Sequence, residues 1–102
     1  MILNAKITDA EIMIEDNGCL TFCIQIDSSD GWSTGIGMFS LDNCHIIDMI
    51  IRDILNTVGV TRWSDLKGKY IRIDDNNDRH STITKISNIL TDNWIDLRSY
   101  FL

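Results

Sequence analysis

The stretch that decides the fold runs from residue 10 to residue 26 and reads AEIMIEDNGCLTFCIQI. Apolar residues alternate with other residues on both sides of Asp16-Asn17-Gly18, a pattern typical of two strands joined by a tight turn. A two-residue turn at Asn17-Gly18 would place apolar residues of one strand opposite polar residues of the other. A three-residue loop with Gly18 in the left-handed conformation pairs apolar with apolar residues, so we predict that register. The predicted core face comprises Ala10, Ile12, Ile14, Leu20, Phe22, Ile24 and Ile26.

The residues before this hairpin have the opposite alternation. Leu3, Ala5 and Ile7 occupy odd positions, whereas the core face of the hairpin occupies even ones, so a β-bulge is expected near Thr8-Asp9. The second face of the hairpin is too polar for a core and too mixed for plain solvent, and we expect it to contact another subunit. Its residues are Glu11, Met13, Cys19, Thr21, Cys23 and Gln25.

The rest of the chain adds one helix and further strands. A loop over residues 28–34 leads into a glycine-containing strand over 35–41. A helix is expected from Asp42 or Asn43 to about Thr57, ended by Gly59. Strands follow over 69–74 and about 80–90 around a polar turn, and a short helix begins near Asp92. The predicted buried stripe of the main helix is Ile46, Ile47, Ile50, Ile51, Ile54, Leu55 and Val58.

These elements predict a single α+β domain over residues 1–102. Its antiparallel sheet has the order βββαββ, with one main helix across one face and a short C-terminal helix. A domain of this size buries only about two-thirds of its unfolded surface, so association would add burial. We therefore expect a homo-oligomer, a dimer or higher.

Composition limits the classes of function. The chain has 15 acidic and 9 basic residues and a net charge of -6, which argues against general nucleic-acid binding and suits a partner with a basic surface. Three cysteines without short paired spacing indicate reduced thiols in a cytosol. The N-terminus lacks the features of a signal peptide, and no apolar run reaches the length of a membrane span. We predict a cytoplasmic protein.

No catalytic or metal-binding constellation stands out. Cys44 and His45 are adjacent at the expected helix start and point in different directions, which does not suit nucleophilic catalysis. The acidic run from Asp74 resembles a calcium loop, but its sixth position is Arg79 rather than glycine. We therefore expect neither an enzyme nor a protein with a cofactor.

Two segments carry the residue types of a binding site. In the loop and strand 30–37, glycines would let the backbone approach a ligand and Trp32 could stack on it, although a loop packed under the helix is the alternative. Arg72 lies beside Tyr70 and near Lys69, where it could hold a phosphate or form a surface salt bridge. Trp94 could contact another subunit or close the core.

The same residues carry a resemblance. The segments concerned are residues 15–22, 31–41, 58–72 and 88–94, which include Val58-Gly59-Val60, Asp65-Leu66-Lys67-Gly68-Lys69 and Asn88-Ile89. In these the chain resembles a family of short proteins found in phages and prophages. It departs from the family pattern at Asn17, which stands in place of a histidine, and in a loop with fewer glycines.

The resemblance implies a phage counter-defence protein, acting in the cytoplasm of the infected bacterial host. One class, of which the Thoeris anti-defence sponge proteins are an example, sequesters a nucleotide immune signal, such as a cyclic ADP-ribose-like molecule or a cyclic oligonucleotide, without cleaving it. The ligand-binding residues would then be Trp32, Gly35, Gly37, Lys69, Arg72, Asn88 and Trp94. A second class, the anti-CRISPR proteins, blocks a host defence protein through an acidic surface. A phage structural or accessory protein is the third possibility.

Overall fold

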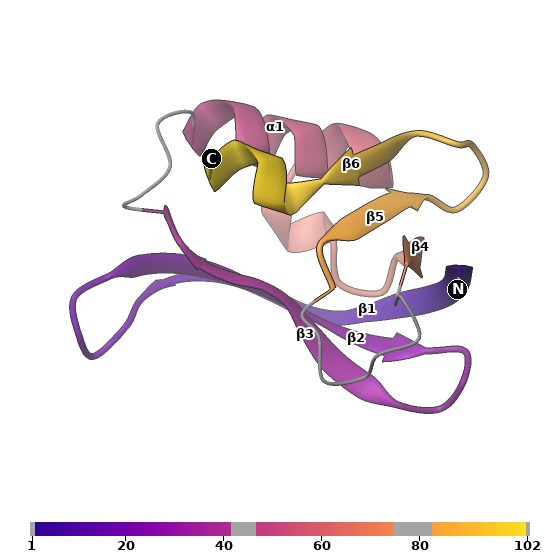
Figure 1. Cartoon of the computed structure of the whole chain (residues 1–102), viewed down its shortest axis with the longest axis horizontal. Helices are drawn as coiled ribbons and strands as arrows, with labels where there is room; N and C mark the ends of the chain where they lie inside the picture. Colours follow the sequence, from indigo (N-terminus) through magenta and orange to yellow (C-terminus); the bar gives the residue numbers. More distant parts are fainter. Residues whose placement is uncertain (1, 42–46, 75–82, 102) are drawn as a thin grey trace.

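The chain forms one antiparallel sheet and one main helix. The computed structural model describes residues 2–41, 47–74 and 83–101. The strands are β1 (Ile2–Ile14), β2 (Leu20–Ser28), β3 (Ser33–Ser40), β4 (Tyr70–Asp74), β5 (Lys85–Asn88) and β6 (Trp94–Asp96), the helix is α1 (Ile47–Val58), and two 3-10 turns are η2 (Trp63–Asp65) and η3 (Leu97–Phe101). The strand order is β3-β2-β1-β4-β5-β6, and α1 lies above the sheet (Figure 1). The predicted α+β class with one main helix is confirmed.

The register of the β1–β2 hairpin is the predicted one. Ile12 lies opposite Phe22 and Ile14 opposite Leu20. Gly18 has a φ of 87°, and its N–H donates to the carbonyl of Glu15 at 2.8 Å, which closes the three-residue loop. The apolar pattern therefore selected this loop over the two-residue alternative.

The predicted bulge is also present. The register of β1 against β2 shifts between Ile7 and Asp9, so the residue between them has no partner in the ladder. Before the shift, the odd-numbered residues of β1 lie on the core side of the sheet, and after it the even-numbered residues do. One long strand can thus serve both halves of the sheet.

Isoleucine dominates the core, which lies between the sheet and α1. Phe22, Ile36 and Ile50 are among the fully buried side chains. The buried hydrophobic residues are Leu3, Ala5, Ile7, Phe22, Ile24, Ile26, Ile36, Leu41, Ile50, Ile54, Leu66, Ile71, Ile73, Ile83, Ile86 and Leu97. Alternate residues of the strands and one stripe of residues along α1 supply these core side chains, as expected from the repeat of two residues in a strand and about 3.6 in a helix.

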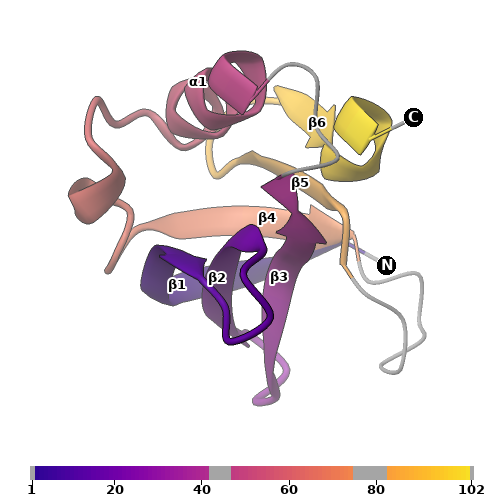
Figure 2. The ribbon, with the colours of Figure 1, turned by 90° about the vertical axis from the view of Figure 1, so that its left-hand side faces the viewer.

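The sheet curls toward closure. A parallel bridge between Ile36 and Ile83 connects β3 to the segment that leads into β5. Since β1 pairs with both β2 and β4, the strands follow one another around a ring in the order β1-β2-β3-β5-β4. This is the connectivity of the OB-fold, a five-stranded, partly open Greek-key barrel. Figure 2 shows β1, β2 and β3 crossing below β4 and β5, with α1 and β6 above them.

The helix ends where glycine was predicted to end it. Gly59 has a φ of 92°, and the N–H groups of Gly59 and Val60 both donate to the carbonyl of Leu55. A left-handed glycine after the last helical residue is the usual way to satisfy such a carbonyl. In the described part of the chain, no helix has the length and apolar character to cross a membrane.

Three predictions about the elements need correction or lie outside the described residues. The expected C-terminal helix is wrong in its first part, because residues 94–96 form β6 and only a 3-10 turn follows. Ile95 pairs with Ile86 there, so an apolar edge of β5 captured this segment as a strand. The expected cap at Asp42 or Asn43, Ile46 of the helix stripe and the polar turn at 75–79 all lie outside the described residues.

Two predicted core positions are also wrong. Ile12 is 42% and Ile14 73% exposed, although both lie on the face that carries buried Phe22 and Ile24. The reason is visible in Figure 1, where the β1–β2 hairpin extends past the end of α1. Ile47, a predicted member of the buried helix stripe at the start of α1, is 39% exposed.

Candidate functional site

The structure brings together the side chains of two of the predicted ligand-binding residues, Arg72 and Trp94. Arg72 on β4 pairs with Ser87 on β5, and Ser87 pairs with Trp94 on β6. The guanidinium carbon of Arg72 lies 5.4 Å from the centroid of the Trp94 ring, within the range of a cation–π contact. The side chains of Arg72 and Trp94 lie on the surface of the sheet that faces away from Ile71 and Ile73, whereas Asn88 pairs with Ile71 and lies on the opposite face.

The guanidinium of Arg72 is already occupied by the protein. Its Nε donates to the carbonyl of Asn88 at 3.1 Å, and its Nη2 donates to the hydroxyl of Ser87 and the carbonyl of Thr91. The same nitrogen lies 2.9 Å from the carboxylate of Asp92. A phosphate at this position would have to displace Asp92, so the arrangement indicates a structural role that holds the β5–β6 turn against β4.

Asn88 has a structural role as well. Its Nδ2 donates to the carbonyl of Thr57 in the last turn of α1 at 3.0 Å. Its Oδ1 accepts from the N–H groups of Leu90 and Thr91. One side chain therefore satisfies a carbonyl at the helix end and shapes the turn between β5 and β6, which explains an asparagine here without a ligand.

The other predicted residues lie elsewhere. Gly35 and Gly37 belong to β3, where they pair with Gln25 and Cys23, and half-buried Trp32 packs against the core in the β2–β3 turn. Lys69 is exposed, just before β4. Arg72 and Trp94 thus belong to β4 and β6, whereas Trp32, Gly35 and Gly37 belong to the β2–β3 turn and β3.

The charged residues are distributed unevenly along the chain. Residues 7–51 contain eight carboxylates and no Lys or Arg, whereas the remainder holds all nine basic residues and seven acidic ones. On the outer face of β1 and β2, Asp9 pairs with Gln25 and Glu11 with Cys23. Burial, and then the negative charges of Glu11 and Asp9, raise the pKa of the Cys23 thiol, while a hydrogen bond from Gln25 opposes them. The half of the molecule built from the first three strands is therefore acidic.

This acidity bears on the fold analogy. OB-folds bind oligonucleotides and oligosaccharides on the face of strands 2 and 3 and through the neighbouring loops. Here β2 and β3 carry no Lys or Arg, and Asp27 on β2 lies opposite Lys6 on β1, while Asp9 and Glu11 on β1 lie opposite Gln25 and Cys23. A polyanion gains nothing from such a surface.

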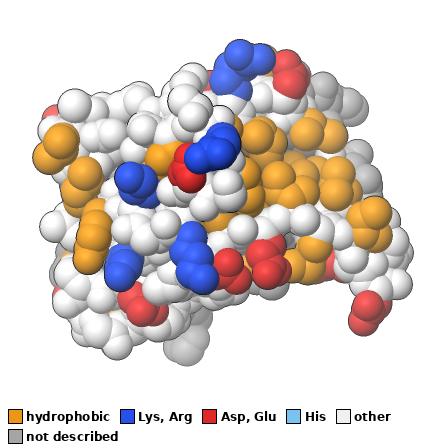
Figure 3. Space-filling view, turned by 180° about the vertical axis from the view of Figure 1, so that it is seen from behind, with side chains coloured by type: hydrophobic (Ala, Val, Ile, Leu, Met, Phe, Trp, Pro, Cys, Tyr) orange, Lys and Arg blue, Asp and Glu red, His pale blue; other side chains and the backbone are white. Residues whose placement is uncertain are grey.

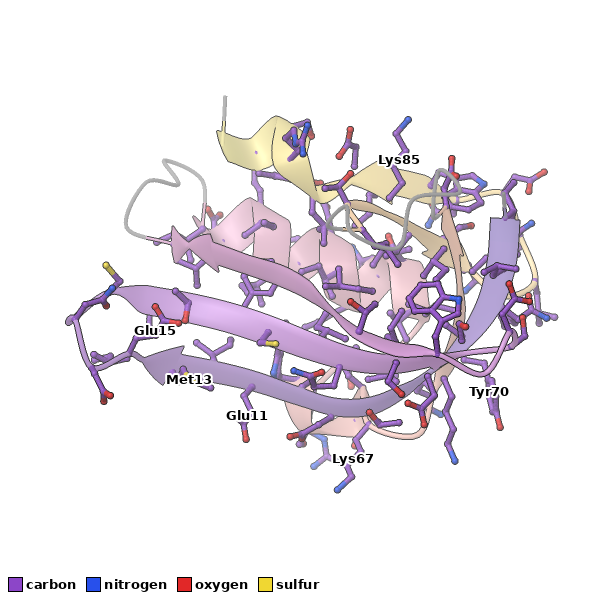
Figure 4. All side chains as sticks on the ribbon, turned by 60° about the horizontal axis from the view of Figure 1, so that its bottom comes forward. Glu11, Met13, Glu15, Lys67, Tyr70 and Lys85 are labelled. Atoms are coloured by element: carbon purple, nitrogen blue, oxygen red, sulfur yellow. The ribbon has the colours of Figure 1, made fainter. Side chains whose placement is uncertain are left out.

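The end of the hairpin is apolar on both faces. We call residues 10–24 the hairpin arm. Ile12 and Ile14 are exposed on one face of the arm, and Met13 is 38% exposed on the other. Figure 4 shows Glu11 projecting from β1 on the side away from α1, with Met13 and Glu15 farther along the hairpin. Carboxylates thus lie on the face of Met13, opposite the face that exposes Ile12 and Ile14.

A groove runs along the surface of α1. Its volume is about 540 Å³, and apolar side chains of Ile47, Ile51, Leu55 and Val60 line it together with four polar residues. In Figure 3 hydrophobic side chains gather over α1 and continue toward the hairpin. Sequence reasoning missed the groove and the exposure of Ile12 and Ile14, although it placed a subunit contact on the other face of the same hairpin.

Comparisons with known protein families, with curated proteins and with solved structures give no match to this chain. Among the described residues no group of His, Cys, Asp or Glu could hold a metal ion. The chemistry of the molecule must therefore be argued from its surfaces.

Proposed function

We propose that the chain is a binding module that takes a protein partner through the hairpin arm. The observation that carries the proposal is the exposure of Ile12, Met13 and Ile14, three consecutive apolar residues that cover both faces of the arm. Contiguous exposed apolar surface on a small domain marks an interaction site. A hairpin that extends past its covering layer gains little from its own packing, so a partner would supply the missing contacts.

The charge of the arm specifies the chemistry of that partner. Glu11, Glu15 and Asp16 flank the exposed apolar residues, and the sequence places no Lys or Arg between residues 7 and 51. Complementary charge speeds encounter and rejects wrong partners. The partner surface is therefore apolar at its centre and basic at its rim.

This surface suits an inhibitor that contacts a host defence protein. The phage setting is an inference from the sequence resemblance alone. Sequestration of a nucleotide signal stays a prediction, and the geometry favours it less than a protein partner. The guanidinium of Arg72 is bound by the protein itself. The cavity of about 370 Å³ beside Trp94 and Lys85 is also lined by Asp74 and Asp96. Two carboxylates oppose an anionic ligand there.

The experiment is affinity capture from a bacterial lysate by three forms of the protein. The double variant Glu11→Lys/Glu15→Lys reverses charge on the arm, and Asp30→Lys makes a matched reversal at the exposed β2–β3 turn. We expect the wild type and Asp30→Lys to retain the same stoichiometric basic protein and the double variant to lose it. Retention of an identical set of proteins by all three would refute a role for the arm.

A further inference from the structure

The second half of β1 forms an open edge of the sheet. β1 pairs with β4 only over residues 2–6, and Ile7 then exchanges backbone hydrogen bonds with the residues just before β4. Over residues 9–14, β1 pairs with β2 alone among the described elements. In Figure 4 β1 is the outermost strand along the stretch that carries Glu11 and Met13. A strand with one unpaired edge can pair with a strand of another chain.

The free backbone groups of this edge belong to the even-numbered residues. The N–H of Glu15 donates across the hairpin at 2.9 Å, so Glu15 directs its backbone groups toward β2. Hydrogen-bonded and non-hydrogen-bonded positions alternate in an antiparallel pair, so Ile12 and Ile14 direct their N–H and C=O groups away from β2. Within the described part of the chain nothing bonds to these groups, whereas the N–H of Ala10 donates to Oδ1 of Asp9 at 3.0 Å. The open edge therefore begins after Ala10 and offers the backbone groups of two isoleucines.

The other two edges of the sheet offer less to an added strand. Among the described strands, β6 at one end has three residues, and β3 at the other end is bridged through Ile36 to the segment before β5. β3 also contains two glycines, which weaken a strand because they have no side chain to pack. The open edge of β1 has β-branched isoleucines instead, which favour strands. It is therefore the best template for strand addition in the described sheet.

The two faces of this edge differ in chemistry. The face toward α1 exposes the two isoleucines, and the outer face carries Asp9, Glu11 and Glu15 with Met13 between the two glutamates. None of these three carboxylates forms an ion pair with a described residue. Lys67 precedes the glycine whose N–H bonds to Ile7, so it adds one cation at the β4 end of the edge. Side chains directly opposite one another on neighbouring strands interact, so an added strand would meet isoleucine on one face and carboxylates on the other.

Charge opposes a second copy of this chain as the added strand. Two arms paired antiparallel and centred on residue 10 would place Asp9 opposite Glu11, and centring on residue 11 would place Glu11 opposite itself. Centring on residue 12 would place Asp9 opposite Glu15, and centring on residue 13 would place Glu11 opposite Glu15. Like charges directly opposite one another destabilise a strand pair. A strand with Lys or Arg at alternate positions has the opposite preference.

We propose that an extended segment of a partner protein adds to the open edge of β1 as a further strand. Its apolar side chains lie on the α1 side beside Ile12 and Ile14, and its Lys or Arg side chains lie opposite the carboxylates of the outer face. In this mode of recognition, backbone hydrogen bonds supply affinity and alternate side chains supply specificity. The proposal rests on the proposed function, because it specifies how the hairpin arm takes a protein partner.

The test uses the wild-type protein and four synthetic nine-residue peptides. The first peptide alternates Val with Lys, and the second alternates Val with Glu. The third and fourth are the first peptide with two N-methyl groups, on two central Val residues in one and on two central Lys residues in the other. An N-methyl group removes the backbone donor, as proline does. In an antiparallel addition the Val N–H groups bond to the edge, and in a parallel addition the Lys N–H groups do.

Fluorescence anisotropy measures the affinities of the four peptides. We expect the Val/Lys peptide to bind and the Val/Glu peptide to bind about tenfold or more weakly, because its carboxylates meet those of β1. One methylated peptide should keep the affinity of its parent, and the other should lose about tenfold or more with its two hydrogen bonds. Which of the two loses affinity assigns the direction of the added strand. Equal affinity of the two methylated peptides would overturn the proposal.

Amide hydrogen exchange locates the bound peptide on the protein. The amides of Ile12 and Ile14 should exchange rapidly in the free protein and about tenfold or more slowly with the Val/Lys peptide bound. The amide of Met13 bonds to β2 already and should change little. A bound peptide that leaves the exchange of Ile12 and Ile14 unaltered would place the binding elsewhere and refute strand addition.

Two variants at one position separate the backbone from the side chain. Ile12→Pro removes the outward N–H and keeps the ladder to β2, which uses the odd-numbered residues, and Ile12→Ala shortens the side chain but keeps the N–H. We expect the proline variant to bind the Val/Lys peptide roughly fivefold more weakly than the alanine variant. Equal affinity of the two would count against the edge. The methylated peptides give the same information on the wild type if the proline variant does not fold.

Two further results distinguish the alternatives. A wild-type dimer in sedimentation equilibrium, with the amides of Ile12 and Ile14 protected in the absence of peptide, would assign the edge to a second copy and overturn the proposal. The lysate capture described above is independent, because it reverses charge on the arm and leaves the backbone of the edge unchanged. A partner lost there on reversal of Glu11 and Glu15, without protection of the two isoleucine amides by the peptide, would refute strand addition and spare the proposed function.

Discussion

Replacing Arg72 by alanine separates a structural residue from a ligand-binding one. A cation kept for a phosphate is held among other positive groups and usually destabilises the unliganded protein, so its removal leaves the free energy of unfolding unchanged or raises it. Arg72 instead donates to two backbone carbonyls and a hydroxyl and lies over the Trp94 ring. Its loss should therefore destabilise the protein in the absence of any ligand.

The size of the effect follows from the burial of each contact. Hydrogen bonds from a charged donor contribute about 1.5–3 kcal/mol each when buried, and the lower end applies because the Arg72 side chain is 21% exposed. The cation–π contact adds about 0.5 kcal/mol or more. The pair with Asp92, whose side chain is 86% exposed, adds little. With only the two part-buried bonds counted, to the Asn88 carbonyl and the Ser87 hydroxyl, the sum for Arg72→Ala is about 3.5 kcal/mol, or a fall in melting temperature of roughly 14 °C or more.

Urea unfolding monitored by circular dichroism measures this directly, with two controls. Asp92→Ala removes only the exposed ion pair and should lower the free energy of unfolding by less than about 1 kcal/mol. Arg72→Lys keeps the charge but cannot reach the same acceptors, because an ammonium lacks the planar fork, and should recover less than half of the loss. An Arg72→Ala protein as stable as Asp92→Ala would show that the network has no structural role.

Three further predictions concern other parts of the fold. Gly18→Ala should lower the free energy of unfolding by about 1 kcal/mol, since φ is 87° there although no atom crowds the added methyl group, and an unchanged urea midpoint would contradict the loop assignment. Asn88→Asp keeps the acceptor for Leu90 and Thr91 but loses the donor to the Thr57 carbonyl, so we expect a loss of about 1–2 kcal/mol and faster amide exchange in the last turn of α1; unaltered exchange would count against the capping role. Burial, followed by the hydrogen bond to Asp53 and its negative charge, raises the pKa of Tyr100 from 10.0 to about 12. The stability due to Tyr100 is therefore complete below pH 10 and lost as the pH rises toward 12, so the melting temperature of the wild type should fall toward that of Tyr100→Phe over this interval, and parallel curves would refute the link.

Part of the candidate site was readable before the fold was known. Arg72 and Trp94 were among the seven predicted ligand-binding residues, and the structure places their side chains in contact. What they do was not readable, because the acceptors of Arg72 come from Ser87, Asn88 and Thr91, which reach it only after β4 and β5 pair. A cation without visible partners in the sequence was therefore interpreted as a ligand-binding residue.

The sequence by itself determined the local geometry of this protein. The register of the hairpin, the loop with Gly18, the bulge after Ile7 and the end of α1 at Gly59 all depend on residues within about fifteen positions of one another. In each case the alternation of apolar residues or a single glycine excludes the competing conformation. Periodicity records which face of an element is apolar.

Periodicity does not record what covers that face, and this only the tertiary structure decided. Ile12 and Ile24 have the same alternation in β1 and β2, yet Ile24 is buried and Ile12 is exposed because α1 does not extend over the end of the hairpin. Residues 94–96 became a strand because β5 offered an unpaired edge, and the bridge from Ile36 to Ile83 joins segments far apart in the chain. Burial depends on the placement of distant elements, so the exposed hairpin arm, which carries the proposed function, emerges only when those elements are packed together.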